Sequence, residues 1–81
     1  MPRYFFDLRD ENELIRDEEG LELSGFPAVQ AEAAKSLADM ARDAVPTSRL
    51  PAPGKRHMAI EVRDGSSPVL QVKFTLEVEP L

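Results

Sequence analysis

Several features on which small proteins build chemistry are missing from this sequence. It contains no cysteine, so neither a disulfide framework nor a thiolate nucleophile is available. His57 is the only histidine, and a zinc site needs more nitrogen or sulfur ligands than one imidazole supplies. The sequence also has no glycine-rich loop of the kind that cradles phosphates. We therefore predict no catalytic residues and no cofactor, and we expect a protein that is not an enzyme.

Positive charge and long apolar runs are also scarce. Lys and Arg number 10 against 15 Asp and Glu, which gives a net charge of −5. Nucleic-acid binding usually needs a basic stripe, and the local excess around Arg49, Lys55 and Arg56 is too small for one. No apolar run reaches the length of about 18 residues that spans a membrane, and acidic residues from Asp7 onward differ from a secretory signal. We therefore expect a cytoplasmic protein that binds neither nucleic acid nor membrane.

The length of 81 residues predicts one small domain over residues 1–81. An apolar fraction of 42% and a charged fraction of 31% are typical of a folded globular chain. A domain of this size buries only about 60% of the surface that its unfolded chain exposes, so its core is small. Binding to a partner protein, or to a second copy of itself, would stabilise such a domain.

Alternating apolar and polar residues predict four strands, at 3–8, 14–17, 57–64 and 69–78. Good helix formers between them predict a helix over 26–45, with Pro27 in its first turn and Pro46 after its end. Three prolines and a glycine predict a loop over 46–56.

This β-β-α-β-β order predicts an α+β domain in which a four-stranded, mainly antiparallel sheet carries one helix on one face. Both hairpins should be antiparallel, but the first strand could neighbour either of the last two. The expected core is Tyr4, Phe6, Leu8, Leu37, Met40, Ile60, Val62, Val72, Phe74 and Leu76.

The acidic stretch IRDEEGLEL, residues 15–23, has two possible roles. Asp17 at its first position and Gly20 at its fourth favour a type I turn with charged corners. Alternatively, the carboxylates of Asp17, Glu18 and Glu19, together with Asp10 and Glu11, could bind a hard cation or a small molecule. Because their spacing does not match a calcium-binding loop, we predict no specific metal site and keep Asp17, Glu18 and Glu19 as weak metal candidates.

The sheet face without the helix is the candidate interaction surface. Alternation places on it Arg3, Phe5, Asp7, Ala59, Glu61, Arg63, Gln71, Lys73 and Thr75. Phe5 is the exception on this polar face: an arginine stem or the loop covers it, or it marks an association surface. We name Arg3, Phe5, Asp7, Glu61, Arg63 and Lys73 as the residues of this predicted surface.

The stretches PRYFFDL, IRDEEGLEL, AEAAKSLADMARDA and MAIEVRDGSSPVLQVKFTLEVE resemble a family of short alphaproteobacterial proteins, especially from rhizobia, whose domain has no known function. The resemblance covers nearly the whole chain and implies a small bacterial cytoplasmic protein, with no catalytic residues to carry over.

The architecture is also similar to that of HicB-type antitoxins, which open with an aromatic strand pair, an acidic turn and a helix rich in Ala, Glu and Leu. That similarity implies an acidic protein that clamps a small basic toxin. We therefore predict a non-enzymatic interaction or regulatory module that acts through its open sheet face or a strand edge, with another protein or a second copy as partner.

Overall fold

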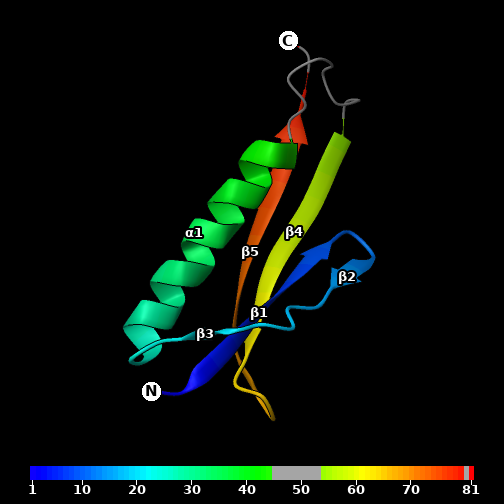
Figure 1. The fold of residues 1–81 in the computed structure, drawn as a ribbon. Coiled ribbons are helices and arrows are strands. Elements are labelled where there is room, and N and C mark those ends of the chain that lie inside the picture. The colour runs from blue at the N-terminus through cyan, green and yellow to red at the C-terminus, as the bar shows by residue number, and fades with distance from the viewer. Residues whose placement is uncertain (45–53, 80) are drawn as a thin grey trace.

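The computed structural model describes residues 1–44, 54–79 and 81 and contains one helix and five strands. Figure 1 shows the helix lying along one side of a twisted sheet, with the two termini at opposite ends of the molecule. The elements are β1 (Arg3–Asp10), β2 (Glu13–Ile15), β3 (Leu21–Glu22), α1 (Phe26–Ala44), β4 (Gly54–Arg63) and β5 (Pro68–Val78). The predicted α+β class is confirmed.

The sheet is antiparallel and has the order β2-β1-β4-β5, with β3 also paired to β1. The strand order that the sequence left open is therefore resolved: β1 neighbours β4. The prediction of four strands was wrong by one strand, because Leu21 and Glu22 pair with Tyr4 and Arg3. Such a short element carries almost no periodic signal in a sequence.

Several strand boundaries differ from the prediction. β1 continues to Asp10, and β2 ends at Ile15, so that Asp17 lies outside the strand. β4 begins at Gly54 rather than at residue 57, because its first residues pair with the end of β5 and thereby satisfy their backbone groups. The rest of the predicted loop, 46–53, and the predicted helix end at residue 45 lie outside the described residues.

The core lies between α1 and the central strands. Val29 and Ala33 of the helix are fully buried together with Ile60 and Val62 of β4. Half-buried side chains surround this cluster: Tyr4, Phe6, Leu8, Leu23, Leu37, Met40, Val69, Leu70 and Val72. The predicted core omitted the small helix residues Val29 and Ala33. It also included Phe74 and Leu76, which are half-buried outside the cluster.

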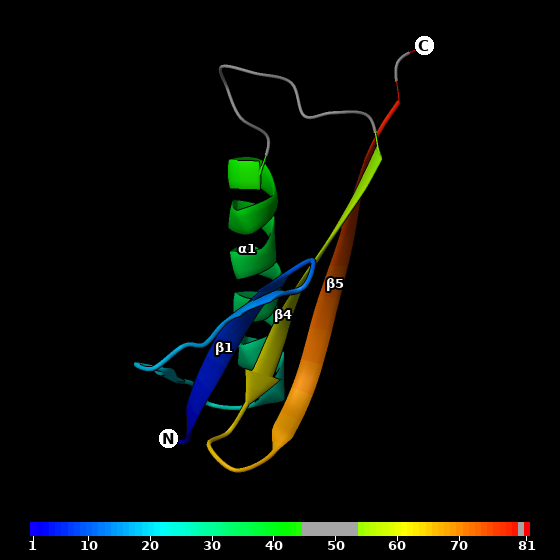
Figure 2. The same ribbon diagram turned by 90° about the vertical axis from the view of Figure 1, so that its right-hand side faces the viewer.

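The helix covers only part of the sheet face on which it lies. It packs against β4 and β5. Figure 2 shows β1, β4 and β5 crossing the view in that order, with α1 behind them and β5 outermost. Tyr4, Phe6 and Leu8 of β1 pack against the core on this face but remain half-buried, and the short strands β2 and β3 lie beyond them at the edge of the sheet. Within the described residues, no helix is long and apolar enough to cross a membrane.

Candidate functional site

The acidic stretch fills a gap in strand pairing at one edge of the sheet. β2 pairs with the end of β1 and β3 with its start, which leaves Phe5, Phe6 and Asp7 between the two short ladders. The Asp17 carboxylate accepts a hydrogen bond from the Phe6 backbone N–H, with an Oδ2–N distance of 3.1 Å. The carboxylate thus takes the position of a neighbouring strand's carbonyl oxygen.

The turn itself is also closed by Asp17. Its Oδ1 accepts hydrogen bonds from the backbone N–H groups of Glu19 and Gly20, at 3.1 and 3.2 Å. Gly20 has a φ of +74°, and an added Cβ there would lie 2.8 Å from Cγ of Arg3 and 2.9 Å from a ring carbon of Phe5. A turn lies where the sequence predicted one, but an aspartate side chain holds it and only glycine fits its last position.

A buried ion pair fixes the turn to the sheet. Asp7 is 5% exposed, and its carboxylate accepts hydrogen bonds from the Asp17 N–H at 2.9 Å and from Arg63 Nε at 3.0 Å. Arg63 also donates to the Asp17 carbonyl oxygen at 2.9 Å. We call Asp7, Asp17 and Arg63 the acid–arginine cluster. It joins three segments that are distant in the sequence and leaves no buried side-chain polar atom of the described residues without a partner.

The cluster changes the pKa of both carboxyl groups. Burial alone would raise the pKa of Asp7. Hydrogen bonds from Arg63 and from the Asp17 backbone lower this pKa by more, so that it lies below its ordinary value. Burial would also raise the pKa of Asp17, but backbone hydrogen bonds from Phe6, Gly20 and Glu19 lower it by more, so that the pKa of Asp17 lies below its ordinary value as well. Both groups are therefore anions at neutral pH.

Much of the predicted interaction surface is occupied by this cluster. Asp7 is buried rather than exposed, and Phe5 is half-buried because the Arg63 guanidinium lies 4.6 Å from its ring centre and Gly20 lies beside it. The structure fits the interpretation in which an arginine covers Phe5, and the second group beside the ring belongs to the turn at Gly20.

The other three predicted surface residues lie around the cluster without converging on it. Arg3 donates to the Glu19 carbonyl oxygen at 2.8 Å. Glu61 accepts a hydrogen bond from Arg9 Nε at 2.7 Å, and Lys73 is exposed on β5. A depression of about 360 Å³ beside Lys73 has a mixed lining, which includes Arg9 and Thr75 as well as the apolar residues Met58, Ala59 and Phe74.

The predicted cation ligands do not come together. Both oxygens of Asp17 accept backbone N–H groups, Asp10 pairs with Arg56, and a Glu11 oxygen accepts the His57 N–H at 2.9 Å. Glu18 and Glu19 are exposed. Within the described ranges, no three Asp, Glu, His or Cys side chains gather as a metal site would require.

The outer part of the helix-side face, between α1 and β2, forms a groove that the sequence did not predict. Two hollows of about 480 and 420 Å³ meet at Leu8, Ile15 and Ser36. Apolar side chains line them: Phe6, Leu8, Ile15, Leu21 and Met40. Ile15 is 53% exposed and Leu21 is 42% exposed, although both pair with residues that face the core.

Acidic side chains surround this apolar floor. Six carboxylates line the two hollows against the two guanidinium groups of Arg16 and Arg56: Asp10, Asp17, Glu19, Glu32, Asp39 and Asp43. Glu32, Asp39 and Asp43 follow one another at helical spacing on α1. We call this apolar floor with its acidic walls the acidic groove. It was missed because the sequence predicts where the helix begins and ends but not which strands it covers.

Comparison with known proteins identifies the family but no closer relative. Residues 3–75 match a domain of unknown function, DUF6894, and the chain therefore belongs to this family. Neither the curated proteins nor the solved structures gave a match.

Proposed function

We propose that this member of the DUF6894 family is a protein-interaction module that binds a basic amphipathic helix of another protein in the acidic groove. The observation that carries the proposal is the exposed apolar floor, with Ile15 at 53% and Leu21 at 42% exposed, inside acidic walls. Exposed apolar side chains that are grouped, rather than scattered, are typical of binding surfaces.

The dimensions of helices and strands support a helix as the occupant. A helix with its side chains is about 10 Å wide, whereas neighbouring strands lie about 4.8 Å apart, so one helix covers roughly two strands. α1 packs against β4 and β5, and a second helix beside it would lie over β2 and over the half-buried side chains of β1 next to it. Leu8 and Ile15 would then contact that helix from below.

The charges support a basic partner. Asp10 and Asp39 are ion-paired with arginines, and Asp17 accepts backbone N–H groups. The remaining wall carboxylates, Glu19, Glu32 and Asp43, give the groove its acidic character. Lysine or arginine side chains flanking an apolar stripe would lie against Glu32 and Asp43 of α1, and opposite charges both speed association and exclude acidic partners.

The two resemblances support a more specific version of this proposal. The likeness to HicB-type antitoxins favours a small basic toxin as the source of the helix. The likeness to short alphaproteobacterial proteins favours a rhizobial protein that acts in the cytoplasm, without enzymatic activity. The alternative of a cation-binding regulator has less support, because Asp10, Glu11 and Asp17 already accept hydrogen bonds.

A titration with a synthetic peptide tests the proposal. The probe is a helix of about 18 residues, or five turns, with leucine on one face and lysine on the other. The same peptide with glutamate in place of lysine serves as the control. NMR of the isotope-labelled protein should show saturable shifts at Phe6, Leu8, Ile15 and Leu21 with the basic peptide alone.

Two substitutions on one strand provide a matched pair. Ile15→Ser removes a side chain from the groove floor. Leu14→Ser removes a partly exposed side chain from the other face of the sheet, where Leu14 lies opposite Arg9. Ile15→Ser should weaken peptide binding by about tenfold or more, and Leu14→Ser should leave it unchanged. Equal binding by both variants, or shifts confined to the open face, would contradict the proposal.

A further inference from the structure

The two edges of the sheet are protected to very different degrees. The edge beyond β1 carries strands of 3 and 2 residues, and the Asp17 carboxylate takes the exposed Phe6 N–H between them. The edge at β5 is a strand of 11 residues, and its proline lies only at its first position. Within the described ranges, no strand pairs with its outer side. A long edge of this kind is a template for pairing with another chain.

We propose that β5 pairs with β5 of a second copy of this chain, antiparallel about a two-fold axis at Thr75. The resulting dimer would join two sheets into one. Because residues directly opposite each other in an antiparallel pair lie on the same face, both helices would lie on the same side of the joined sheet. The acidic groove lies at the opposite edge of each sheet, beside β2, and would remain open in the dimer.

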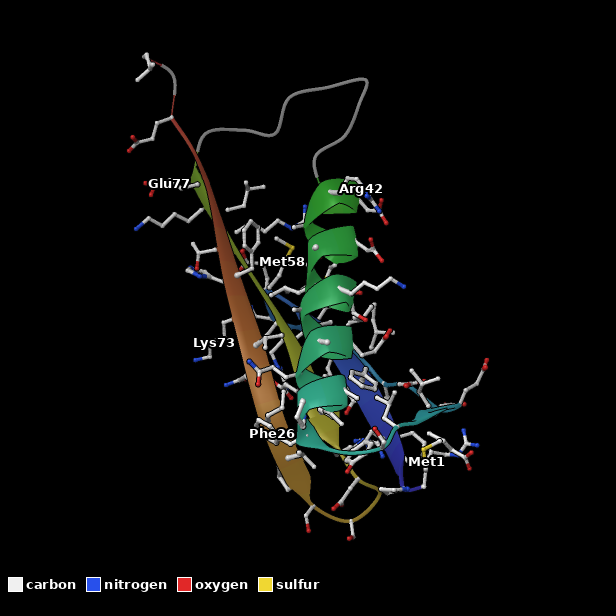
Figure 3. The ribbon with its side chains drawn as sticks, turned by 90° about the vertical axis from the view of Figure 1, so that its left-hand side faces the viewer. Met1, Phe26, Arg42, Met58, Lys73 and Glu77 are labelled. Carbon is white, nitrogen blue, oxygen red and sulfur yellow. The ribbon has the colours of Figure 1, made fainter. Side chains whose placement is uncertain are left out.

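In this register the charged residues of one β5 lie opposite residues of the other sign on the second β5. With Thr75 opposite Thr75, Lys73 of each copy lies opposite Glu77 of the other, so that two ion pairs form across the axis. Figure 3 shows Lys73 and Glu77 on the side of β5 that faces away from α1. Both side chains are exposed in the single chain. Opposite charges in directly paired positions stabilise a ladder, and threonine pairs do so as well.

The apolar face of β5 also favours this arrangement. Because side chains alternate between the two faces of a strand, Phe74 and Leu76 lie on the helix side, and both are only half-buried in the single chain. In the proposed register Phe74 of one copy lies opposite Leu76 of the other, next to the axis. Dimer formation would therefore bury apolar surface on one face and pair charges on the other.

The longest overlap of two β5 strands is disfavoured by charge. Centring the axis on Lys73 would pair all 11 residues but would bring two lysines directly opposite each other. An axis at Thr75 gives a shorter ladder, but it replaces the repulsion between two lysines by two attractive pairs of Lys73 with Glu77. Charge therefore selects the register as well as the partner.

A charge-reversal experiment tests the pairing. Lys73→Glu would place two glutamates opposite Glu77 residues, and Glu77→Lys would place two lysines opposite Lys73 residues, so each variant alone should dimerise at least about tenfold more weakly than the natural chain. An equimolar mixture should recover a heterodimer, because every crossing pair then has opposite charges. Sedimentation equilibrium measures the association, and circular dichroism verifies that both variants are folded.

Cysteine substitution tests the register, since the chain has no cysteine of its own. Thr75→Cys should form a covalent dimer on mild oxidation or with a short bismaleimide linker. Lys73→Cys is the control, because its two copies would lie about 14 Å apart, four residues along the ladder. Ile15→Ser should dimerise normally, which separates this proposal from binding in the groove. A natural chain that stays monomeric at millimolar concentration, variants that dimerise as well as it does, or preferential crosslinking through position 73 would overturn the inference.

Discussion

The acid–arginine cluster and the acidic groove are both rich in carboxylates and meet at Asp17, yet their other carboxylates are used in opposite ways. In the cluster, Asp7 and Asp17 accept hydrogen bonds from backbone N–H groups and from Arg63. In the groove, Glu32 and Asp43 surround an apolar floor that remains exposed to solvent. The comparison teaches that acidic residues report function only after their partners are known. A carboxylate satisfied within the chain stabilises the fold, whereas one beside exposed apolar surface can attract a partner.

The largest loss of stability should follow Asp7→Asn. The substitution removes the charge that faces Arg63 in a nearly buried site, and we expect the free energy of unfolding to fall by about 2–4 kcal/mol. Urea denaturation measures the change. Glu61→Gln is the control, because the Arg9–Glu61 pair is far more exposed than the Arg63–Asp7 pair and should contribute at most about 1 kcal/mol. A similar loss in both variants would show that the cluster has no special role.

A somewhat smaller loss should follow Gly20→Ala. The alanine would adopt a φ of +74° and would bring its Cβ within 3 Å of Arg3 and Phe5. We expect a cost of about 1–3 kcal/mol, measured by thermal or urea unfolding. Gly25→Ala is the matched control, since a Cβ at Gly25 meets no atom within 4 Å. Equal stability of the two variants would mean that the acidic turn is not tightly held.

Acid should weaken the fold through the same cluster. The ordinary pKa of both Asp7 and Asp17 is 3.8, and the folded values lie below it. Well above pH 3.8 both groups are deprotonated in the folded and in the unfolded chain, and the full stabilisation is present. As the pH falls below 3.8, the unfolded chain binds protons that the folded chain does not, so the free energy of unfolding decreases until the folded groups protonate too.

Unfolding curves at about pH 5 and at about pH 3 would measure this acid effect. Asp7→Asn should show a shallower dependence on pH than the natural chain, because one of the two titrating groups is gone. An unchanged slope would assign the acid sensitivity to other carboxylates.

Substitution in the groove should hardly change stability. Ile15 is 53% exposed, so we expect Ile15→Ser to shift the free energy of unfolding by no more than about 0.5 kcal/mol. Urea denaturation beside the Asp7→Asn variant gives the comparison directly. A loss of more than about 2 kcal/mol would identify Ile15 as a core residue rather than part of a binding surface.

The smallest effect should come from divalent cations. The two oxygens of Asp17 are engaged, and no three acidic or histidine side chains of the described residues gather as a metal site would require. We therefore expect calcium or magnesium to cause only weak, unsaturated NMR shifts. Saturable shifts localised at residues 17–20 would instead support the cation-binding alternative.

Periodic segments predicted the fold well, and short or non-periodic ones did not. The alternation in β1, β4 and β5 and the composition of α1 predicted those elements to within a few residues. Leu21 and Glu22 were missed as a strand because two residues have no period. Asp7 was assigned to the wet face by alternation alone, whereas its burial depends on Asp17 and Arg63, which a local pattern cannot connect. The groove was missed for a similar reason, since it depends on where α1 lies across the sheet.

The most direct test of the two roles measures peptide affinity and unfolding free energy together for Asp7→Asn and Ile15→Ser, at a temperature at which circular dichroism shows both variants to be folded. If the cluster stabilises the fold and the groove binds partners, Asp7→Asn loses stability but keeps its affinity for the basic peptide. Ile15→Ser should keep its stability but lose affinity for the basic peptide. A parallel loss of both properties in either variant would contradict the division of roles between the two acidic regions.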